Sequence, residues 1–80
     1  MAELDQEIRE VVARVIKMDP NKIDANANIF SEYHVDSLLG VEILAALDKK
    51  YGVDVPEDKI RHIKTLNNII EITKEYLSKK

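Results

Sequence analysis

The sequence has no cysteine, and only two glycines and two prolines among its 80 residues. The absence of cysteine excludes disulfides, thiolate metal sites and thiol nucleophiles. With few helix breakers and 45% apolar residues, we expect residues 1–80 to fold as a single domain. No apolar run approaches the roughly 18–20 residues of a membrane span, so no membrane association is expected.

The start of the chain is acidic, and no apolar secretory segment follows it. The simplest interpretation is a small soluble protein of the cytoplasm. The only histidines, His34 and His62, lie far apart without the spacing of metal ligands, and no metal site is expected.

Lys and Arg are absent from residues 23–48, a stretch that contains five acidic residues. The net charge of −3 argues against nucleic acid as a partner, whereas a local acidic surface attracts basic proteins. The alternative is a chance distribution in a mildly acidic chain. The acidic residues in this stretch are Asp24, Glu32, Asp36, Glu42 and Asp48.

Apolar residues recur at three- and four-residue steps between Leu4 and Ile16, which predicts an amphipathic helix. Pro20 disfavours helix at the residue before it, so this helix should end near Lys17 or Met18. Residues 19–35 then read as a long loop, rich in Asn and Asp, and long loops are often functional. Four apolar residues should hold it to the core: Ile23, Ile29, Phe30 and Tyr33.

A second helix should begin at Ser37, because Asp36 is a good N-cap, and should end at Gly52. Residues 57–63 predict one short helix, with Ile60 and Ile63 turned inward. Thr65 should cap a last helix. The predicted fold is therefore all-α, a four-helix bundle of three main helices and one short one.

Ser37 is the residue that decides the function. A nucleophilic serine needs a positioned base, and no triad pattern accompanies it, so an enzyme is not expected. Ser37 is then either part of a helix cap or an attachment point. A phosphodiester would be favoured at a helix start, and Asp36 could help a modifying enzyme hold a divalent cation.

The surrounding sequence resembles the acyl carrier protein family from about residue 4 to residue 77. The order of its segments makes the resemblance specific: a serine motif before a helix, a Gly-x-x-x-Pro step about 15 residues later, and a Thr-capped last helix. The matching segments are Asp36-Ser37-Leu38, Val41-Glu42-Ile43, Ala46-Leu47, Tyr51-Gly52-Val53, Val55-Pro56 and Ile63-x-Thr65-Leu66.

The resemblance implies that Ser37 carries a phosphopantetheine arm, added from coenzyme A by a phosphopantetheinyl transferase. Acyl groups are then held as thioesters on the arm's own thiol, for fatty-acid, lipid or specialised metabolite synthesis. Such a carrier is a non-catalytic protein, expected to be monomeric, that visits acyl-loading and acyl-processing enzymes.

The family also implies a surface for basic docking patches and a cleft that shelters the acyl chain. The surface residues expected here are Leu38, Leu39, Val41, Glu42, Ala45, Asp48 and Glu57. The cleft residues expected are Phe30, Ile43, Leu44, Leu47, Ile63 and Leu66, although ordinary core packing would look the same in the sequence.

Several residues depart from the family pattern. His34 stands where glycine is common, so either the turn differs or His34 adopts a left-handed conformation. Leu39 and Gly40 replace polar residues, and Leu39 is expected to be exposed. Lys49-Lys50 replaces acidic residues, which narrows the acidic face and favours a specialised carrier.

Three other functions stay open at this point. The chain could be an aminoacyl or D-alanyl carrier, or a polyketide carrier, since these also use a serine after Asp. From a different class, it could be an unmodified helical interaction module in which Ser37 only caps a helix. The cargo, its chain length, the pathway and the partner enzymes cannot be read from the sequence.

Overall fold

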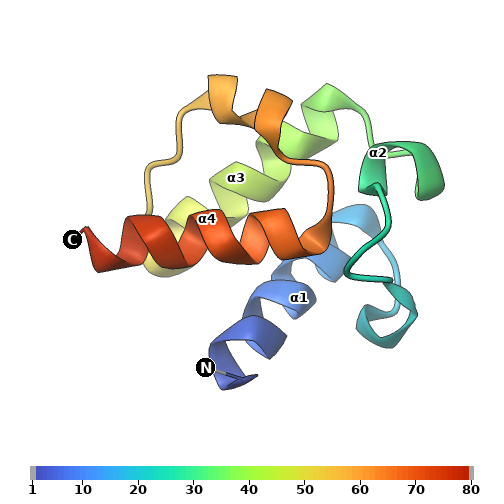
Figure 1. Cartoon of the computed structure of the whole chain (residues 1–80), viewed down its shortest axis with the longest axis horizontal. Helices are drawn as coiled ribbons and strands as arrows, with labels where there is room; N and C mark the ends of the chain where they lie inside the picture. The colour runs from blue at the N-terminus through green and yellow to red at the C-terminus, as the bar shows by residue number, and fades with distance from the viewer. Residues whose placement is uncertain (1, 80) are drawn as a thin grey trace.

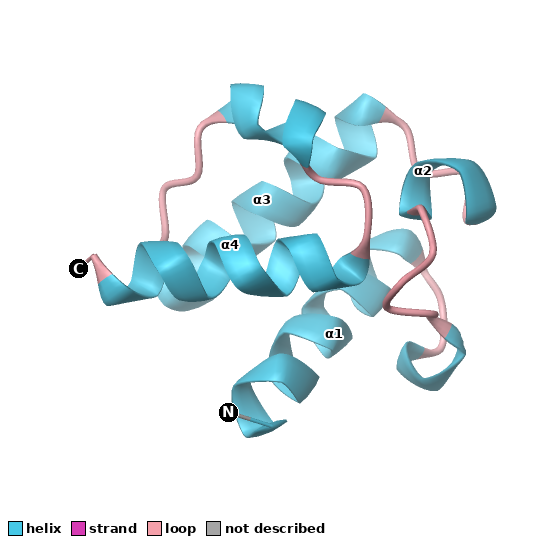
Figure 2. Ribbon diagram, viewed as in Figure 1, coloured by secondary structure: helices cyan, strands magenta, loops and turns pink. Residues whose placement is uncertain are grey.

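The computed structural model describes residues 2–79 and places helices around a single apolar centre (Figure 1). Helix α1 packs against α3 and α4, and the short helix η2 packs against α3. Among the described residues there is no β-strand, only one isolated bridge between Asn28 and Thr65 (Figure 2). The all-α prediction is confirmed. The elements are α1 (Ala2–Ile16), η1 (Pro20–Lys22), α2 (Ile29–Glu32), α3 (Ser37–Tyr51), η2 (Glu57–His62) and α4 (Leu66–Ser78).

Helix α1 ends at Ile16, one residue earlier than predicted. Lys17 takes a left-handed conformation with φ 61°, and the Met18 amide donates to the Ala13 carbonyl over 2.9 Å. This is the Schellman arrangement, which satisfies carbonyls that the end of a helix leaves unpaired.

The prediction of an irregular loop over residues 19–35 is wrong in part, because η1 and α2 lie inside it. Both short helices are started by side-chain caps. The Asp19 carboxylate accepts from the Asn21 amide at 2.9 Å, and Asn28 Oδ1 accepts from the Phe30 amide at 2.9 Å. The Asn and Asp residues that suggested a loop are thus the caps of two short helices.

Both apolar and polar contacts hold this segment to the bundle. Ile23 and Ile29 are fully buried, as expected, while Phe30 and Tyr33 are half-buried. Arg9 of α1 donates to the carbonyls of Pro20 at 3.0 Å and Ile23 at 2.6 Å. Because these carbonyls are satisfied by a side chain, the segment can lie close to the core without unpaired backbone groups.

The caps of α3 agree with the sequence prediction. Asp36 precedes the helix and its carboxylate accepts from the Leu39 amide at 2.8 Å. Gly52 follows the helix in the left-handed region, with φ 67°. A glycine there avoids the steric cost that a Cβ would bring.

The predicted short helix is a 3-10 helix, η2, which ends at His62 rather than Ile63. Helix α4 then begins with the predicted cap Thr65. Thr65 Oγ1 accepts from the Asn68 amide, and Asn68 Oδ1 accepts from the Thr65 amide, both at 3.1 Å. This is a capping box in which asparagine replaces the usual Glu or Gln.

All the main helices, and the segments between them, supply side chains to the core. Within the described chain no helix is long and apolar enough to cross a membrane. The buried apolar residues are Ile8, Val11, Val12, Ala13, Ile23, Ile29, Val35, Ile43, Leu44, Leu47, Val53, Val55, Ile63, Leu66, Ile69 and Ile70.

One polar contact joins the far end of α3 to α1. The Tyr51 hydroxyl donates to Glu7 Oε1 over 3.0 Å. Burial, followed by this hydrogen bond to the carboxylate, raises the pKa of Tyr51 from 10.0 to about 12. The neutral phenol is therefore favoured in the folded protein more than in the unfolded chain.

We predict that Tyr51 makes the fold sensitive to alkaline pH. The unfolded tyrosine ionises near pH 10 and the folded one near 12, so its contribution is complete below pH 10 and is lost as the pH rises toward 12. Urea unfolding of wild type and Tyr51→Phe, compared at pH 8 and pH 11, measures the effect. The wild-type advantage should shrink at pH 11; an unchanged difference would contradict the linkage.

Candidate functional site

Ser37 is the first residue of α3 and its side chain is exposed. The cap is made by Asp36: its carboxylate holds the Leu39 amide, and its carbonyl accepts from the Gly40 amide over 3.0 Å. The Ser37 hydroxyl takes no part in this cap. It is therefore available for chemistry while the helix start stays intact.

His34 forms the turn that brings the chain from α2 into α3. Its φ is 55°, in the left-handed region, which confirms one of the two possibilities raised by the sequence. A side chain other than glycine pays a steric cost there. The position of Ser37 at the edge of the bundle thus depends on a locally strained turn.

A groove runs beside Ser37 between α3 and η2. Leu38, with 68% of its surface exposed, forms part of its wall. The groove carries both apolar walls and charged residues. Its lining residues are Ser37, Leu38, Val41, Glu57, Ile60 and Arg61.

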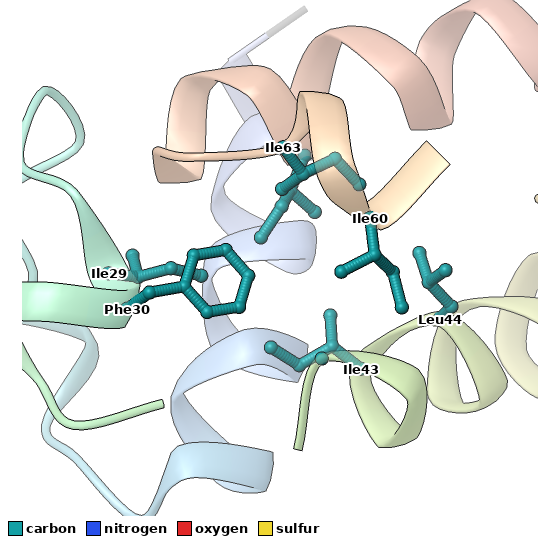
Figure 3. A pocket seen from close by; sticks show the side chains of 8 residues that line it. Ile29, Phe30, Ile43, Leu44, Ile60 and Ile63 are labelled. Atoms are coloured by element: carbon teal, nitrogen blue, oxygen red, sulfur yellow. The ribbon is translucent and has the colours of Figure 1, made fainter. Parts of the chain in front are cut away.

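A partly enclosed apolar cavity lies next to this groove, under η2 (Figure 3). Ile60 lines both, so the groove and the cavity adjoin at this side chain. The lining residues are Ile29, Phe30, Gly40, Ile43, Leu44, Ile60, Ile63 and Ile69.

The cavity includes four of the six residues expected for the cleft: Phe30, Ile43, Leu44 and Ile63. Leu47 and Leu66 do not line it; both are fully buried in the core. Sequence reasoning did not assign Ile29, Gly40, Ile60 or Ile69 to a cleft. For Ile60 a signal was present, since the periodicity of residues 57–63 already turned it inward.

A shallow hollow along α3 brings together residues expected to face partners. Val41, Ala45, Asp48 and Glu57 line it, and the structure adds Asp54. The floor is apolar, and the three charged side chains at the hollow are all carboxylates. The full lining is Val41, Leu44, Ala45, Asp48, Asp54, Val55, Pro56 and Glu57.

Two further residues of the expected surface lie outside this hollow. Glu42 is exposed on α3. The expectation that Leu39 is exposed is wrong, because Leu39 is half-buried and packs against the core. It follows Leu38 by one residue and therefore points about 100° further round the helix, toward the bundle.

The lysines at the end of α3 lie on the other flank of the helix. Lys49 and Lys50 line a separate groove between α1 and α3, together with Arg14. They do not line the acidic hollow. Helix α3 therefore has an acidic flank toward η2 and a basic flank toward α1.

Between residues 2 and 79, no cluster of three or more His, Asp or Glu side chains could hold a metal ion. The site does fit an anionic arm. An exposed hydroxyl lies at a helix start, where the first amides lack carbonyl partners within the helix, and a groove with apolar walls and Arg61 leads away from it.

Comparison with known proteins identifies the class of protein. The model of a family described as "Phosphopantetheine attachment site" matches residues 6–72. This match runs from within α1 to within α4 and includes Ser37 and the groove residues. The cofactor of such a carrier domain is covalent phosphopantetheine.

Relatives from several bacteria carry the name acyl carrier protein. The relative from Rickettsia canadensis (strain McKiel) is 32% identical over 72 residues, which covers 90% of this chain and 84% of the relative. The relative from Amoebophilus asiaticus (strain 5a2) is 26% identical over the whole of both chains. One from Thermosynechococcus vestitus is 27% identical over 70 residues, 88% of this chain and 86% of the relative. The chain belongs to the acyl carrier protein family.

We predict that His34→Gly leaves the protein as stable as wild type or more stable. Glycine removes a left-handed strain of roughly 1–2 kcal/mol, offset by about 0.5–1 kcal/mol of added chain entropy. Urea unfolding should show a gain between zero and about 1.5 kcal/mol. His34→Ala keeps the Cβ and is the control, with no gain expected. An equal loss in both variants would show that the imidazole stabilises the turn, whereas a greater loss in His34→Gly than in His34→Ala would contradict the relief of strain.

Proposed function

We propose that Ser37 bears the phosphopantetheine arm and that the protein carries acyl groups as thioesters for lipid or specialised metabolite synthesis. The observation that carries this proposal is the placement of Ser37. Its hydroxyl is exposed, is not used by the helix cap, and opens onto a groove that adjoins an apolar cavity at Ile60.

The start of α3 suits a phosphodiester. Asp36 occupies the Leu39 and Gly40 amides, which leaves the Ser37 and Leu38 amides as the first-turn donors without a carbonyl partner in their own helix. The helix dipole adds positive potential at the same place. Arg61, across the groove, adds a cation that an anionic link can approach.

The cavity favours an acyl cargo over an aminoacyl or D-alanyl cargo. Its lining consists of isoleucines, one leucine, one phenylalanine and one glycine, so the side chains offer no partner to an ammonium group. Burying a charged amine there would be strongly unfavourable, whereas an alkyl chain gains from leaving water. The bound cofactor supplies the thiol that forms the thioester.

The acidic flank of α3 is the surface on which we expect partner enzymes to dock. Asp48, Asp54 and Glu57 surround an apolar hollow that adjoins the Ser37 groove through the shared residues Val41 and Glu57. A basic patch on an enzyme would find complementary charge there and apolar surface to cover. The position is suited to presenting the arm to the docked enzyme.

We predict that Ser37 is the residue modified with phosphopantetheine, and measurement of the intact mass tests this. Incubation with coenzyme A and a promiscuous phosphopantetheinyl transferase should add the mass of one phosphopantetheine to wild type. Ser37→Ala should gain none. Ser31→Ala, which removes an exposed serine near the start of α2, should still be modified. A folded wild-type protein that gains no mass would overturn the carrier function.

We predict that the two flanks of α3 respond differently to charge reversal. Asp48→Lys should lower kcat/KM for modification of the apo protein by about threefold to tenfold at low salt, because it repels a basic enzyme surface. Lys49→Glu, on the other flank, is the matched control and should not slow the reaction. The difference should shrink at high salt. Equal effects of both substitutions would place docking elsewhere.

A further inference from the structure

Gly40 is a buried glycine in the first half of α3, at a position where the backbone does not need it. Its φ is not positive; among the described glycines only Gly52 takes that conformation. A glycine inside a helix lowers stability relative to alanine. Gly40 therefore lowers the stability of α3, although the backbone conformation at this position does not require glycine.

The surroundings of Gly40 do not require glycine either. A Cβ built there would lie 3.6 Å from Ile60 Cγ2, 3.6 Å from Phe30 Cε1 and 3.7 Å from Phe30 Cζ. These are ordinary van der Waals distances, so alanine fits the structure as it stands and would fill a gap. An added methyl group would occupy the space between Gly40 and the two side chains that close the cavity.

That space lies where a chain from Ser37 would enter. Ile60 stands between the groove and the cavity, and it faces Gly40 (Figure 3 shows Ile60 with Phe30, Ile43 and Leu44). The cavity itself offers only about 10 Å³ to the centre of a water-sized sphere. That is about the room for one water molecule and too little for an alkyl chain. The walls must therefore move apart to admit one.

The wall that carries Ile60 is held by few backbone interactions of its own. Helix η2 is a 3-10 helix, with poorer hydrogen-bond geometry than an α-helix, and Pro56 gives it no side-chain cap. Its far end is fixed, because the Ile29 amide donates to the Lys64 carbonyl over 2.8 Å. A movement of η2 about this fixed end would shift Ile60 away from Gly40 and widen the entrance.

We propose that Gly40 is a specificity-determining residue that sets which acyl chains the interior admits. The missing side chain leaves room for the first carbons of a long acyl chain to pass between Phe30 and Ile60. This inference rests on the proposed attachment of the arm to Ser37. It explains why the helix keeps a glycine that its backbone and its neighbours do not need.

The test compares acetyl and octanoyl forms of four proteins: wild type, Gly40→Ala, Gly40→Val and the double variant Gly40→Ala/Lys49→Gly. Each apo protein is loaded from acetyl- or octanoyl-coenzyme A, and intact mass verifies the product. Melting temperature and the rate of thioester cleavage by hydroxylamine are then measured. Lys49 is exposed and lines neither the cavity nor the acidic hollow, so its change to glycine offsets most of the gain in helix propensity without changing the cavity.

Gly40→Ala should melt about 4–8 °C above wild type in the apo form, and the double variant near wild type. In wild type the octanoyl form should melt higher than the acetyl form and be cleaved more slowly. Both differences should be smaller in Gly40→Ala and in the double variant, and lost in Gly40→Val. If these differences are also smaller in the double variant, whose helix stability is near that of wild type, the cause is the filled space at residue 40 and not the change in helix stability.

Two results would overturn the inference, and they are distinguishable. If no variant takes up either acyl arm, the carrier function fails and this inference fails with it. If all variants load and the octanoyl form is equally protected in each, the carrier function stands and Gly40 does not select cargo.

Discussion

The hydrogen bond from the Leu39 amide to the Asp36 carboxylate is the interaction on which the site depends. At 2.8 Å it fixes the first turn of α3 without using the next side chain along the chain. If Ser37 were the cap, its hydroxyl would be engaged by the backbone and turned toward the helix axis. Because Asp36 takes that role, the hydroxyl lies outside the cap, at the positive end of the helix dipole. The sequence left open which of the two residues caps the helix. In the structure Asp36 is the cap, and the Ser37 hydroxyl stays outside it.

The same helix start organises the space behind it. One turn into α3, Gly40 faces Phe30 of α2 and Ile60 of η2, and the next turn supplies Ile43 and Leu44 to the same cavity. A helix with 3.6 residues per turn places Ser37 on the groove and Gly40 and Ile43 on the interior side. The distance from the arm to the cavity is therefore set by helix geometry. Only η2, which is short and poorly capped, is left to decide whether the two are connected.

Much of the fold could be predicted because local rules and packing agree in it. Backbone sterics and unpaired amides determine where helices begin and end, and the residue types that satisfy them can be recognised in the sequence. The caps Asp36 and Thr65 and the helix end at Gly52 are examples. Residues 19–35 were harder to predict, because Asp and Asn favour both loops and helix caps, and η1 and α2 are too short to show periodicity. Leu39 was wrongly expected to be exposed. Consecutive apolar residues beside a surface motif do not show which of them faces the solvent and which faces the core. The position of Ile60 between the groove and the cavity could not be predicted, because it depends on where η2 packs against α3. The spacing of residues along the chain does not determine that packing.

Residues that lower local stability gather at the Ser37 end of α3. His34 holds a left-handed conformation without being glycine, and Gly40 weakens the helix although alanine would fit. At the other end the chain follows every local preference: Gly52 occupies the left-handed stop, and Thr65 and Asn68 complete a capping box. Such departures are not confined to this site, since Lys17 at the end of α1 is also left-handed without being glycine. There, however, the conformation closes the helix end with a hydrogen bond from the Met18 amide to the Ala13 carbonyl, which is an ordinary local reason for it. His34 and Gly40 have no such local reason, and both lie close to the serine that must expose its hydroxyl and the cavity that must open. The folded state can tolerate both costs because only the sum of all contributions has to stay favourable.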